Sequence, residues 1–490
     1  MRPRLRDLIL GLGLFALVAT GCKVGKADVD TWKGTVKGPG KMVAVILADK
    51  YDVDLRSYAA LALVDMERHD VDGVAELLNV IAKVDATTRD QVIAAIVPGL
   101  TQLMQASDAA ATPEGPPARQ VRAKDAAFAL ITYSSADSRK ALTQAVMKWY
   151  MADFNGRSLS GNYSAEQVVR ALGSSAATIL VDGLSAEQPQ QALVKLAELI
   201  GQLGDADAKK RAGQKLVAIE VEMRSDNFLK WLKAQIVAQL GAAAAQDAQR
   251  VEKTAQLNRE KFIDEGAIPA MAYLADQVEV SSRLLAIAAE KSPALTERRT
   301  RALRALEGKV NESQLHELLS LALDPSSPAA VQDYAFDRVG DIRSPKAIPP
   351  MWPLVQDGEK QRERWRAGEL VLAIGGSSVL SEFFSKLPKG NDVRYEPEEL
   401  DGYAGRMGQM NPLPTAVASS EIGSPNWWDR VIALDFFLRK GTEADLPAMS
   451  RLLQDKAAVK GKNWPPGTTV GQLAKQAIDG LRERLGRPRG

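Results

Sequence analysis

The chain has 490 residues, too many for one ordinary compact core, so we expect either several domains or one elongated repeat protein. Its composition, 46% hydrophobic and 25% charged, is typical of a folded soluble protein. The net charge is +2, and residues 1–21 supply all of it through three arginines against one aspartate. The remaining chain is neutral, which removes the electrostatic case for nucleic-acid binding, so we expect no nucleic-acid partner.

The N-terminus has the pattern of an export signal. Three arginines within the first six residues precede an apolar run over residues 8–18. That run is shorter than the roughly 20 residues that a membrane-spanning helix needs, and it fits the apolar region of a signal peptide. The residues that follow, Ala19-Thr20-Gly21-Cys22, resemble a bacterial lipobox, although Ala19 stands where leucine is usual. An ordinary secretory signal with an incidental cysteine is the alternative.

The resemblance implies that residues 1–21 are removed and that Cys22 carries the lipid. Cys22 is the only cysteine in the chain, so no intramolecular disulfide can form. By the same resemblance, Lys23 is not the aspartate that commonly retains lipoproteins in the inner membrane. We therefore expect a lipid-anchored protein of the bacterial cell envelope, on the outer membrane and facing the periplasm. Residues 22–41 contain several glycines and lysines and predict a flexible tether after the lipidated cysteine.

From residue 42 to residue 390 the pattern is helical almost throughout. Apolar residues recur at spacings of three and four, as they do at Val92, Ala95, Ile96, Leu100 and Leu103. Short turns with Gly, Pro, Asp or Ser separate these segments, and alternating strand-like runs are rare. The sequence therefore predicts an all-α fold.

Similar segments repeat at a spacing of 33 to 35 residues. Asp324 and Asp357 follow similar aliphatic helix ends 33 residues apart, and Asp455 ends another such segment. One helix of each unit begins with a basic residue, continues with small alanines and ends with large aliphatics. The segments with this pattern carry Arg56, Arg122 and Lys124, Arg299, Arg366 and Arg430.

These units resemble HEAT repeats in a short form, whereas the Trp, Gly-Tyr and Pro pattern of tetratricopeptide repeats is not in register. The resemblance implies an α-solenoid of helical hairpins over residues 42–390. It also implies a C-terminal repeat over residues 426–490, with a capping helix from about residue 470 to 485. Between them, residues 391–425 are rich in Gly and Pro and predict an insertion, either plain or partner-binding. Residues 106–118 predict a further loop.

Catalytic and ligand-binding patterns are scarce. The sequence has no phosphate-cradling Gly-rich loop and no nucleophile elbow, and its two histidines are His69 and His316, which we expect at the surface or at a helix end. No His, Asp or Glu group has the spacing of metal ligands. We therefore predict no enzyme, no cofactor and no metal. One acidic run is either a weak cation site or a solvated loop: Glu396, Glu398, Glu399 and Asp401.

Aromatic residues near the C-terminus are the candidates for partner binding. Trp427 and Trp428 are adjacent, and adjacent residues cannot both face one side of a helix, so exposure of one of them is one interpretation. Exposed tryptophan favours binding surfaces. Tyr403, in the predicted insertion, is the third candidate. Packing of these rings in the core is the interpretation that we favour, and partner binding through an exposed tryptophan is the alternative.

The function that the sequence favours is a non-enzymatic, membrane-anchored scaffold that binds one or more envelope proteins, whose identity it does not name. One alternative is an enzyme or enzyme accessory of the envelope, for which a pocket would have to group several of Arg394, Glu398, Glu399, Asp401 and Arg406. Another is a cell-wall or glycan-binding protein that uses exposed tryptophan.

Overall fold

The computed structural model describes residues 24–66, 71–105, 116–240, 247–390 and 393–488, and within them the fold is all-α. The described residues contain no strand, only an isolated bridge between Ala458 and Thr469. The chain divides into two compact units, unit 1 up to Leu274 and unit 2 from Ala275. The predicted signal peptide, Cys22, His69 and most of the predicted loop at 106–118 lie outside the described residues.

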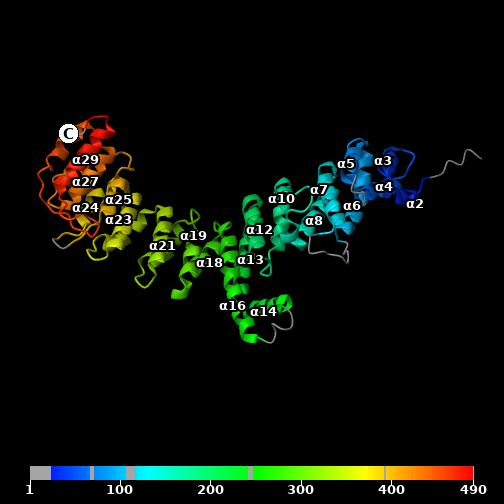
Figure 1. The fold of residues 1–490 in the computed structure, drawn as a ribbon, viewed down its shortest axis with the longest axis horizontal. Coiled ribbons are helices and arrows are strands. Elements are labelled where there is room, and N and C mark those ends of the chain that lie inside the picture. The colour runs from blue at the N-terminus through cyan, green and yellow to red at the C-terminus, as the bar shows by residue number, and fades with distance from the viewer. Residues whose placement is uncertain (1–23, 67–70, 106–115, 241–246, 391–392, 489–490) are drawn as a thin grey trace, which may run out of the picture. The chain divides into compact units, whose positions relative to one another are not determined.

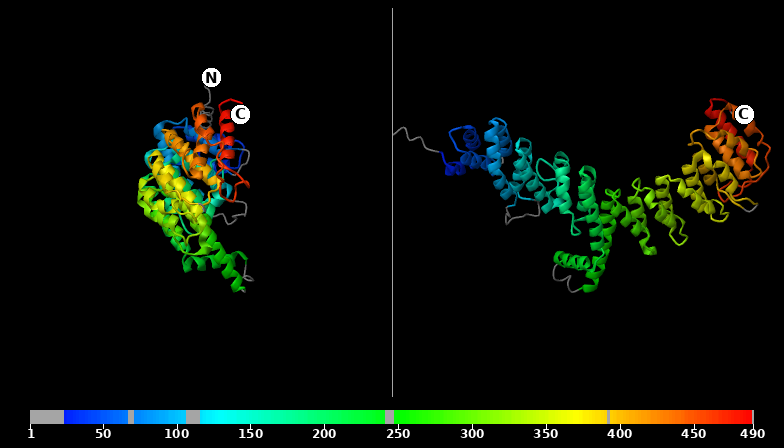
Figure 2. Two further views of the ribbon diagram at one scale, coloured as in Figure 1. Left: turned by 90° about the vertical axis from the view of Figure 1, so that its left-hand side faces the viewer. Right: turned by 180° about the vertical axis from the view of Figure 1, so that it is seen from behind.

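Unit 1 is a stack of helical hairpins in which helices adjacent in the chain pack on one another (Figures 1 and 2). A hairpin of α14 and α16 extends to one side of this stack (Figure 1). Unit 1 contains α2 (Lys26–Trp32), α3 (Gly38–Leu47), α4 (Val53–Val64), α5 (Gly73–Ile81), α6 (Ala86–Gln105), α7 (Ala118–Leu130), α8 (Ala136–Ala152), α9 (Phe154–Arg157), α10 (Ala165–Leu172), α11 (Ser174–Gly183), α12 (Gln190–Leu203), α13 (Ala206–Met223), α14 (Asp226–Leu240), α16 (Ala248–Lys261), η2 (Phe262–Ala267) and α17 (Ile268–Ala272).

Unit 2 continues the hairpin pattern in two layers. In one layer α19, α21, α23, α25, α27 and α29 each contact the next, and the other layer includes α18, α20, α22 and α24. The bounds are α18 (Val278–Ala288), α19 (Thr296–Ala305), α20 (Leu315–Leu323), α21 (Ala329–Ile342), α22 (Ile348–Val355), α23 (Gln361–Gly375), η6 (Gly376–Val379), α24 (Leu380–Lys386), α25 (Pro397–Met407), α26 (Thr415–Glu421), α27 (Trp427–Lys440), α28 (Leu446–Ser450) and α29 (Val470–Arg484). The predicted C-terminal capping helix is α29.

The turns of unit 2 share one local device. In Asp324, Asp357 and Asp455 the Oδ1 atom accepts the backbone N–H two residues later, at 2.8–2.9 Å. The carboxylate therefore closes the turn that leads from one helix of a unit to the next. The three aspartates that the sequence aligns as repeat equivalents thus accept the same backbone hydrogen bond in their turns.

Buried arginines form hydrogen bonds or ion pairs that connect successive repeats. Arg299 is almost fully buried; its Nε donates to the carbonyl of Ala288, in the preceding helix, at 2.7 Å. Its Nη2 donates to Ser327, in the turn of the next repeat, at 2.9 Å. Arg56 and Arg430 make corresponding contacts to the turn before them and to the following repeat. Each such residue satisfies turn carbonyls that would otherwise be buried without a donor.

Two predicted boundaries are wrong. The predicted tether at 22–41 contains α2 and the start of α3, which bury Val29, Pro39 and, in the rest of α3, Met42 against the stack. Pro39 fits there because the first turn of a helix needs no internal amide partner. The segment between Cys22 and the first helix is therefore three residues long rather than about twenty.

The predicted insertion at 391–425 is mostly helical as well, because it contains α25 and α26. The glycines of this segment do not form a loop; they allow helix α25 to pack closely against α23. A side chain at Gly402 would meet Trp365 of α23 at 2.8 Å, and Gly368 of α23 lies equally close beneath the ring of Tyr403. Residues 393–425 thus continue the repeat stack of unit 2.

Among the described residues, one helical stretch, Gln361–Lys386, is long and apolar enough to cross a membrane. It comprises α23, η6 and α24 and is half-buried within unit 2, and it contains the fully buried Arg364. A core helix of a soluble protein passes the same test, and this stretch packs as one.

Candidate functional site

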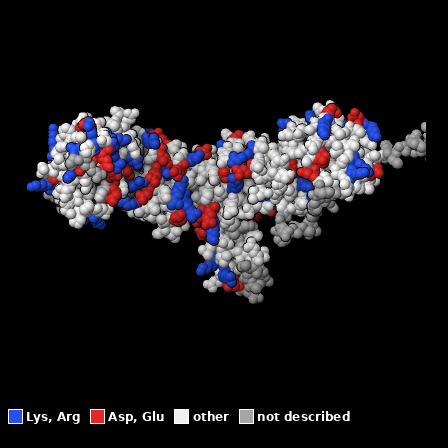
Figure 3. Space-filling model, turned by 45° about the horizontal axis from the view of Figure 1, so that its top comes forward, with Lys and Arg blue, Asp and Glu red and all other residues white. Residues whose placement is uncertain are grey.

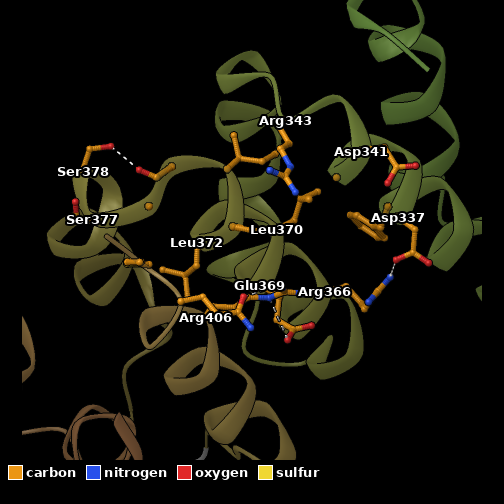
Figure 4. A pocket seen from close by; sticks show the side chains of 18 of the residues that line it. Asp337, Asp341, Arg343, Arg366, Glu369, Leu370, Leu372, Ser377, Ser378 and Arg406 are labelled. Atoms are coloured by element: carbon orange, nitrogen blue, oxygen red, sulfur yellow. Dashed lines mark hydrogen bonds and ion pairs between the residues drawn. The ribbon is translucent and has the colours of Figure 1, made fainter. Parts of the chain in front are cut away.

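Unit 2 contains a pocket of about 660 Å³ at the C-terminal ends of α21, α23 and α25. Basic side chains from three successive repeats line it: Arg343, Arg366 and Arg406 (Figure 4). Apolar residues, among them Leu370 and Leu372, line it as well, and the hydroxyls of Ser377 and Ser378 add polar groups. Asp337, Asp341 and Glu369 line it too, so the pocket combines an apolar surface with hydroxyls and with charged groups of both signs.

Arg343 has an unusual backbone conformation. It follows α21 with φ 54° and ψ 28°, in the left-handed region, and is the only non-glycine residue with positive φ among the described residues. The C-cap of the next repeat's helix α23 is Gly376, with φ 56°, and Gly308, with φ 65°, lies in the turn after α19 in the preceding repeat. A side chain costs roughly 1–2 kcal/mol in this region, and glycine avoids that cost.

The Arg343 side chain also lacks a partner among the described residues. It is exposed, and it makes no hydrogen bond or ion pair to any residue that the structure describes. Asp341, the acid nearest to it in the chain, already binds Arg338 at 3.2 Å and accepts from the amide of Gly308 at 3.2 Å. An arginine in a strained conformation without an internal partner is available to an incoming anion.

The other two arginines belong to a ladder of ion pairs, which we call the charge ladder. In it an arginine of each helix reaches an acid of the preceding one: Arg362 to Asp333, Arg366 to Asp337, Arg406 to Glu369 and Arg439 to Asp401. Each pair is partly exposed and adds little stability by itself. Basic and acidic side chains are accordingly interleaved over unit 2 in the left-hand part of Figure 3.

Arg406 is the most loosely held member of the ladder. Its Nε lies 3.8 Å from Glu369 Oε1, beyond hydrogen-bond range, and its Nη1 is 3.5 Å from Gln409. Arg366 is tied to both Asp337 and Asp333. The pocket therefore offers one free guanidinium, at Arg343, and one readily redirected guanidinium, at Arg406. Two such groups match the planar, bidentate geometry of a carboxylate.

The aromatic candidates for partner binding are in the core, which is the interpretation that the sequence favours, and the alternative of an exposed tryptophan at 427 or 428 is wrong. Trp427 is 8% exposed, Trp428 3% and Tyr403 not at all. Tyr395 stacks on Trp428, with ring centroids 5.1 Å apart, and meets Trp427 edge to face. Both sides of α27 are covered, because α25 packs on one part of it and α29 on another. The glycan-binding alternative requires an exposed tryptophan at 427 or 428, and both are buried.

The acidic run is structural. Glu396 accepts the backbone amides of Lys462 and Asn463, each at 2.8 Å, and Glu399 forms a fully buried pair with Arg364. Asp401 belongs to the charge ladder. No group of three or more His, Cys, Asp or Glu suited to a metal occurs among the described residues.

The five residues whose grouping would favour an enzyme are not brought together. Of Arg394, Glu398, Glu399, Asp401 and Arg406, only Arg406 lines the pocket. His316 lies exposed on α20, as expected. Arg343, the residue that distinguishes the pocket, was not predicted. Its signal in the sequence is its alignment with Gly308 and Gly376, 35 residues before and 33 residues after it.

No family model matches this chain, and no curated protein matches it either.

Proposed function

We propose that this protein is a lipid-anchored, non-enzymatic repeat protein of the bacterial envelope, and that unit 2 binds an acidic segment of a partner protein. The observation that carries the binding role is Arg343, an arginine in the pocket that is unpaired among the described residues and stands at a helix C-cap where the next repeat has Gly376. Strained backbone conformations persist at sites where function requires them. The cost at Arg343 is offset if its guanidinium binds a ligand.

A protein segment fits this site better than an isolated small anion. The charge ladder extends from the pocket along α21, α23, α25 and α27, so polar groups of both signs continue beyond it. Repeat proteins use such extended surfaces to bind other proteins. A carboxylate bound by Arg343 would fix the register of the segment, and Arg406 and the rest of the ladder would contact its neighbouring residues.

We predict that Arg343→Gly weakens the binding of an acidic peptide without destabilising the protein. A hydrogen bond to a charged group contributes about 1.5–3 kcal/mol, so the dissociation constant should rise at least tenfold. Glycine relieves the left-handed strain, so thermal stability should stay unchanged or increase. Fluorescence anisotropy with a labelled Asp/Glu-rich heptapeptide measures the first effect, and differential scanning fluorimetry the second.

Arg451→Ala is the matched control, because Arg451 is exposed in unit 2 and does not line the pocket. It should leave peptide affinity unchanged. Arg343→Lys should bind with intermediate affinity, because lysine keeps the charge but lacks the planar fork. Equal affinity in wild type and Arg343→Gly, or equal affinity for a neutral peptide of the same length, would remove the pocket from the proposed function.

Anchoring is tested separately. We expect Cys22→Ser to move the protein from the membrane fraction to the soluble envelope fraction, because it removes the only thiol that can be acylated. Incorporation of labelled palmitate should disappear in the same variant. Detergent-phase partitioning that is the same for Cys22→Ser and wild type would overturn lipid attachment as the membrane anchor.

A further inference from the structure

The first helices of unit 1 begin almost immediately after the predicted lipid site. Helix α2 starts at Lys26, four residues after Cys22, and four residues of chain reach at most roughly 14 Å. Helix α3 follows and packs on α4 and α5, at the N-terminal end of the unit 1 stack (Figure 1). If Cys22 is acylated as proposed above, this end of unit 1 lies within that distance of the bilayer surface.

One face of α3 has no partner in the described structure. Met42, Val45 and Ile46 are buried in the stack, whereas four residues at helical spacing point outward and are exposed: Lys37, Lys41, Ala44 and Leu47. Val36, just before the helix, is 75% exposed and Leu47 is 42% exposed. We call these five residues the α3 face. The terminal helix of a repeat stack is normally polar on its outer side, whereas this one mixes two lysines with exposed apolar side chains.

The charge of the α3 face has one sign. Residues 36–48 contain no Asp or Glu. The neighbouring Lys26 and Lys33 are paired, to Asp54 at 2.7 Å and to Asp65 at 3.2 Å. Lys37 and Lys41, in contrast, form no ion pair with any residue that the structure describes. Two free ammonium groups therefore lie among exposed apolar side chains.

An aromatic ring completes the pattern. The Lys41 ammonium lies 5.1 Å from the centroid of the Trp32 ring, and Trp32 is only partly buried. Tryptophan and lysine together with short apolar side chains are enriched where proteins meet the headgroup layer of a bilayer. The apolar groups enter the edge of the hydrocarbon region, and the ammonium groups stay with the phosphates.

We propose that the α3 face binds the surface of a bilayer containing anionic phospholipid, so that the N-terminal end of unit 1 lies against the membrane. This inference rests on the proposed lipid anchoring, which would place the face at the headgroups. Each lysine near an anionic surface contributes about 1 kcal/mol. The lipid retains the protein, and the α3 face orients it.

The test uses the complete mature chain as Cys22→Ser, so that no acyl chain contributes. Since Cys22 is the only cysteine, Ala44→Cys then provides a single site for an environment-sensitive fluorophore on the α3 face. We expect a blue shift on adding vesicles of phosphatidylethanolamine and phosphatidylglycerol in a 3:1 ratio. Phosphatidylcholine vesicles should give none, and high salt should weaken the response. The same fluorophore at Ala444→Cys, an exposed position of unit 2, should not respond.

Lys37→Glu/Lys41→Glu should reduce vesicle binding at least tenfold, as expected for the loss of two headgroup contacts. Lys37→Gln/Lys41→Gln should show a smaller loss, and circular dichroism should be unchanged in both because the two lysines are exposed. An equal response to both vesicle types, an equal response at Ala444→Cys, or no effect of the lysine substitutions would overturn the proposal. Failure of the anchor itself would appear elsewhere, as unchanged fractionation of Cys22→Ser.

Discussion

Arg364→Ala is expected to destabilise unit 2 by about 3–5 kcal/mol, the range measured when one partner of a buried ion pair is removed. Arg364 and Glu399 are both fully buried, and two guanidinium nitrogens bind the carboxylate at 2.8 Å each. The guanidinium also donates to the carbonyl of Arg394 at 2.8 Å and lies 4.4 Å from the Tyr395 ring centroid. Burial raises the pKa of Glu399, and the Arg364 guanidinium opposes that shift. Without it the carboxyl group loses its main partner.

Urea unfolding followed by tryptophan fluorescence measures this effect, since five of the eight tryptophans lie in unit 2. Arg362→Ala on the same helix is the control, because its pair with Asp333 is partly exposed and should cost no more than about 1 kcal/mol. The double variant Arg364→Met/Glu399→Leu should recover much of the unfolding free energy that Arg364→Ala loses, since the double variant leaves no buried charge unpaired. If Arg364→Ala unfolds at the same urea concentration as Arg362→Ala, the buried pair does not hold the repeats together.

Asp435→Asn is expected to stabilise the protein at pH 8 by on the order of 2 kcal/mol and to have little effect at pH 4. Asp435 lies on α27, and burial raises its pKa to about 7. The nearby Asp401 carboxylate raises it further, and Arg439 opposes the shift. In the unfolded chain the carboxyl titrates near pH 3.9. This carboxyl therefore lowers the stability of the wild type as pH rises from about 4 to about 7, because the folded state must release a proton from a partly buried site.

The difference in unfolding free energy between Asp435→Asn and wild type, measured from pH 4 to pH 8, should grow across that interval and then level off. Asp276→Asn, at an exposed aspartate of unit 2, is the control substitution. Asp401→Asn removes a neighbouring negative charge that raises the pKa of Asp435. In an Asp401→Asn background, the stability difference caused by Asp435→Asn should therefore develop at lower pH. A pH-independent difference for Asp435→Asn would show that its carboxyl titrates as in water.

The sequence predicts the helical class and the repeat spacing because both depend on local patterns. Apolar spacing identifies the helices, and Asp324, Asp357 and Asp455 each close a turn within two residues of themselves. The register of the buried cations is harder to predict. Arg366 has the expected sequence context, yet the buried cation of that repeat is Arg364, and Arg366 belongs to the charge ladder. Two arginines on one helix turn are distinguished only by the helices packed against them.

Glycine and proline misled the prediction where their role depends on tertiary contacts. Gly402 looks like a loop residue, but it lies against Trp365 and lets α25 approach α23 closely. The sequence nonetheless contains a signal for a helix start at Pro397. Pro397 occupies the first turn of α25 and is followed by two glutamates, a pattern typical of helix N-termini. The burial of Trp427 and Trp428 depends on Tyr395 and on segments beyond the repeat, which no local pattern reveals.

The candidate site depends on one departure from a repeat pattern. Its pocket is formed by three repeats together, so local sequence cannot outline it. Arg343 stands out only when its left-handed conformation and the positive φ angles of Gly308 and Gly376 are known. A repeat alignment combined with backbone angles therefore locates a site that motif searching misses.

In-cell photo-crosslinking from the pocket tests the central claim most directly. Ser377 is exposed and lines the pocket, so a benzoylphenylalanine there would contact a bound segment (Figure 4). We predict one discrete membrane-fraction product, with the crosslink mapping to an acidic segment of the partner. That product should be lost in Arg343→Gly and retained in Arg451→Ala. A product that persists unchanged in Arg343→Gly, or the absence of any product in the wild type, would contradict the proposal that this pocket binds a partner protein.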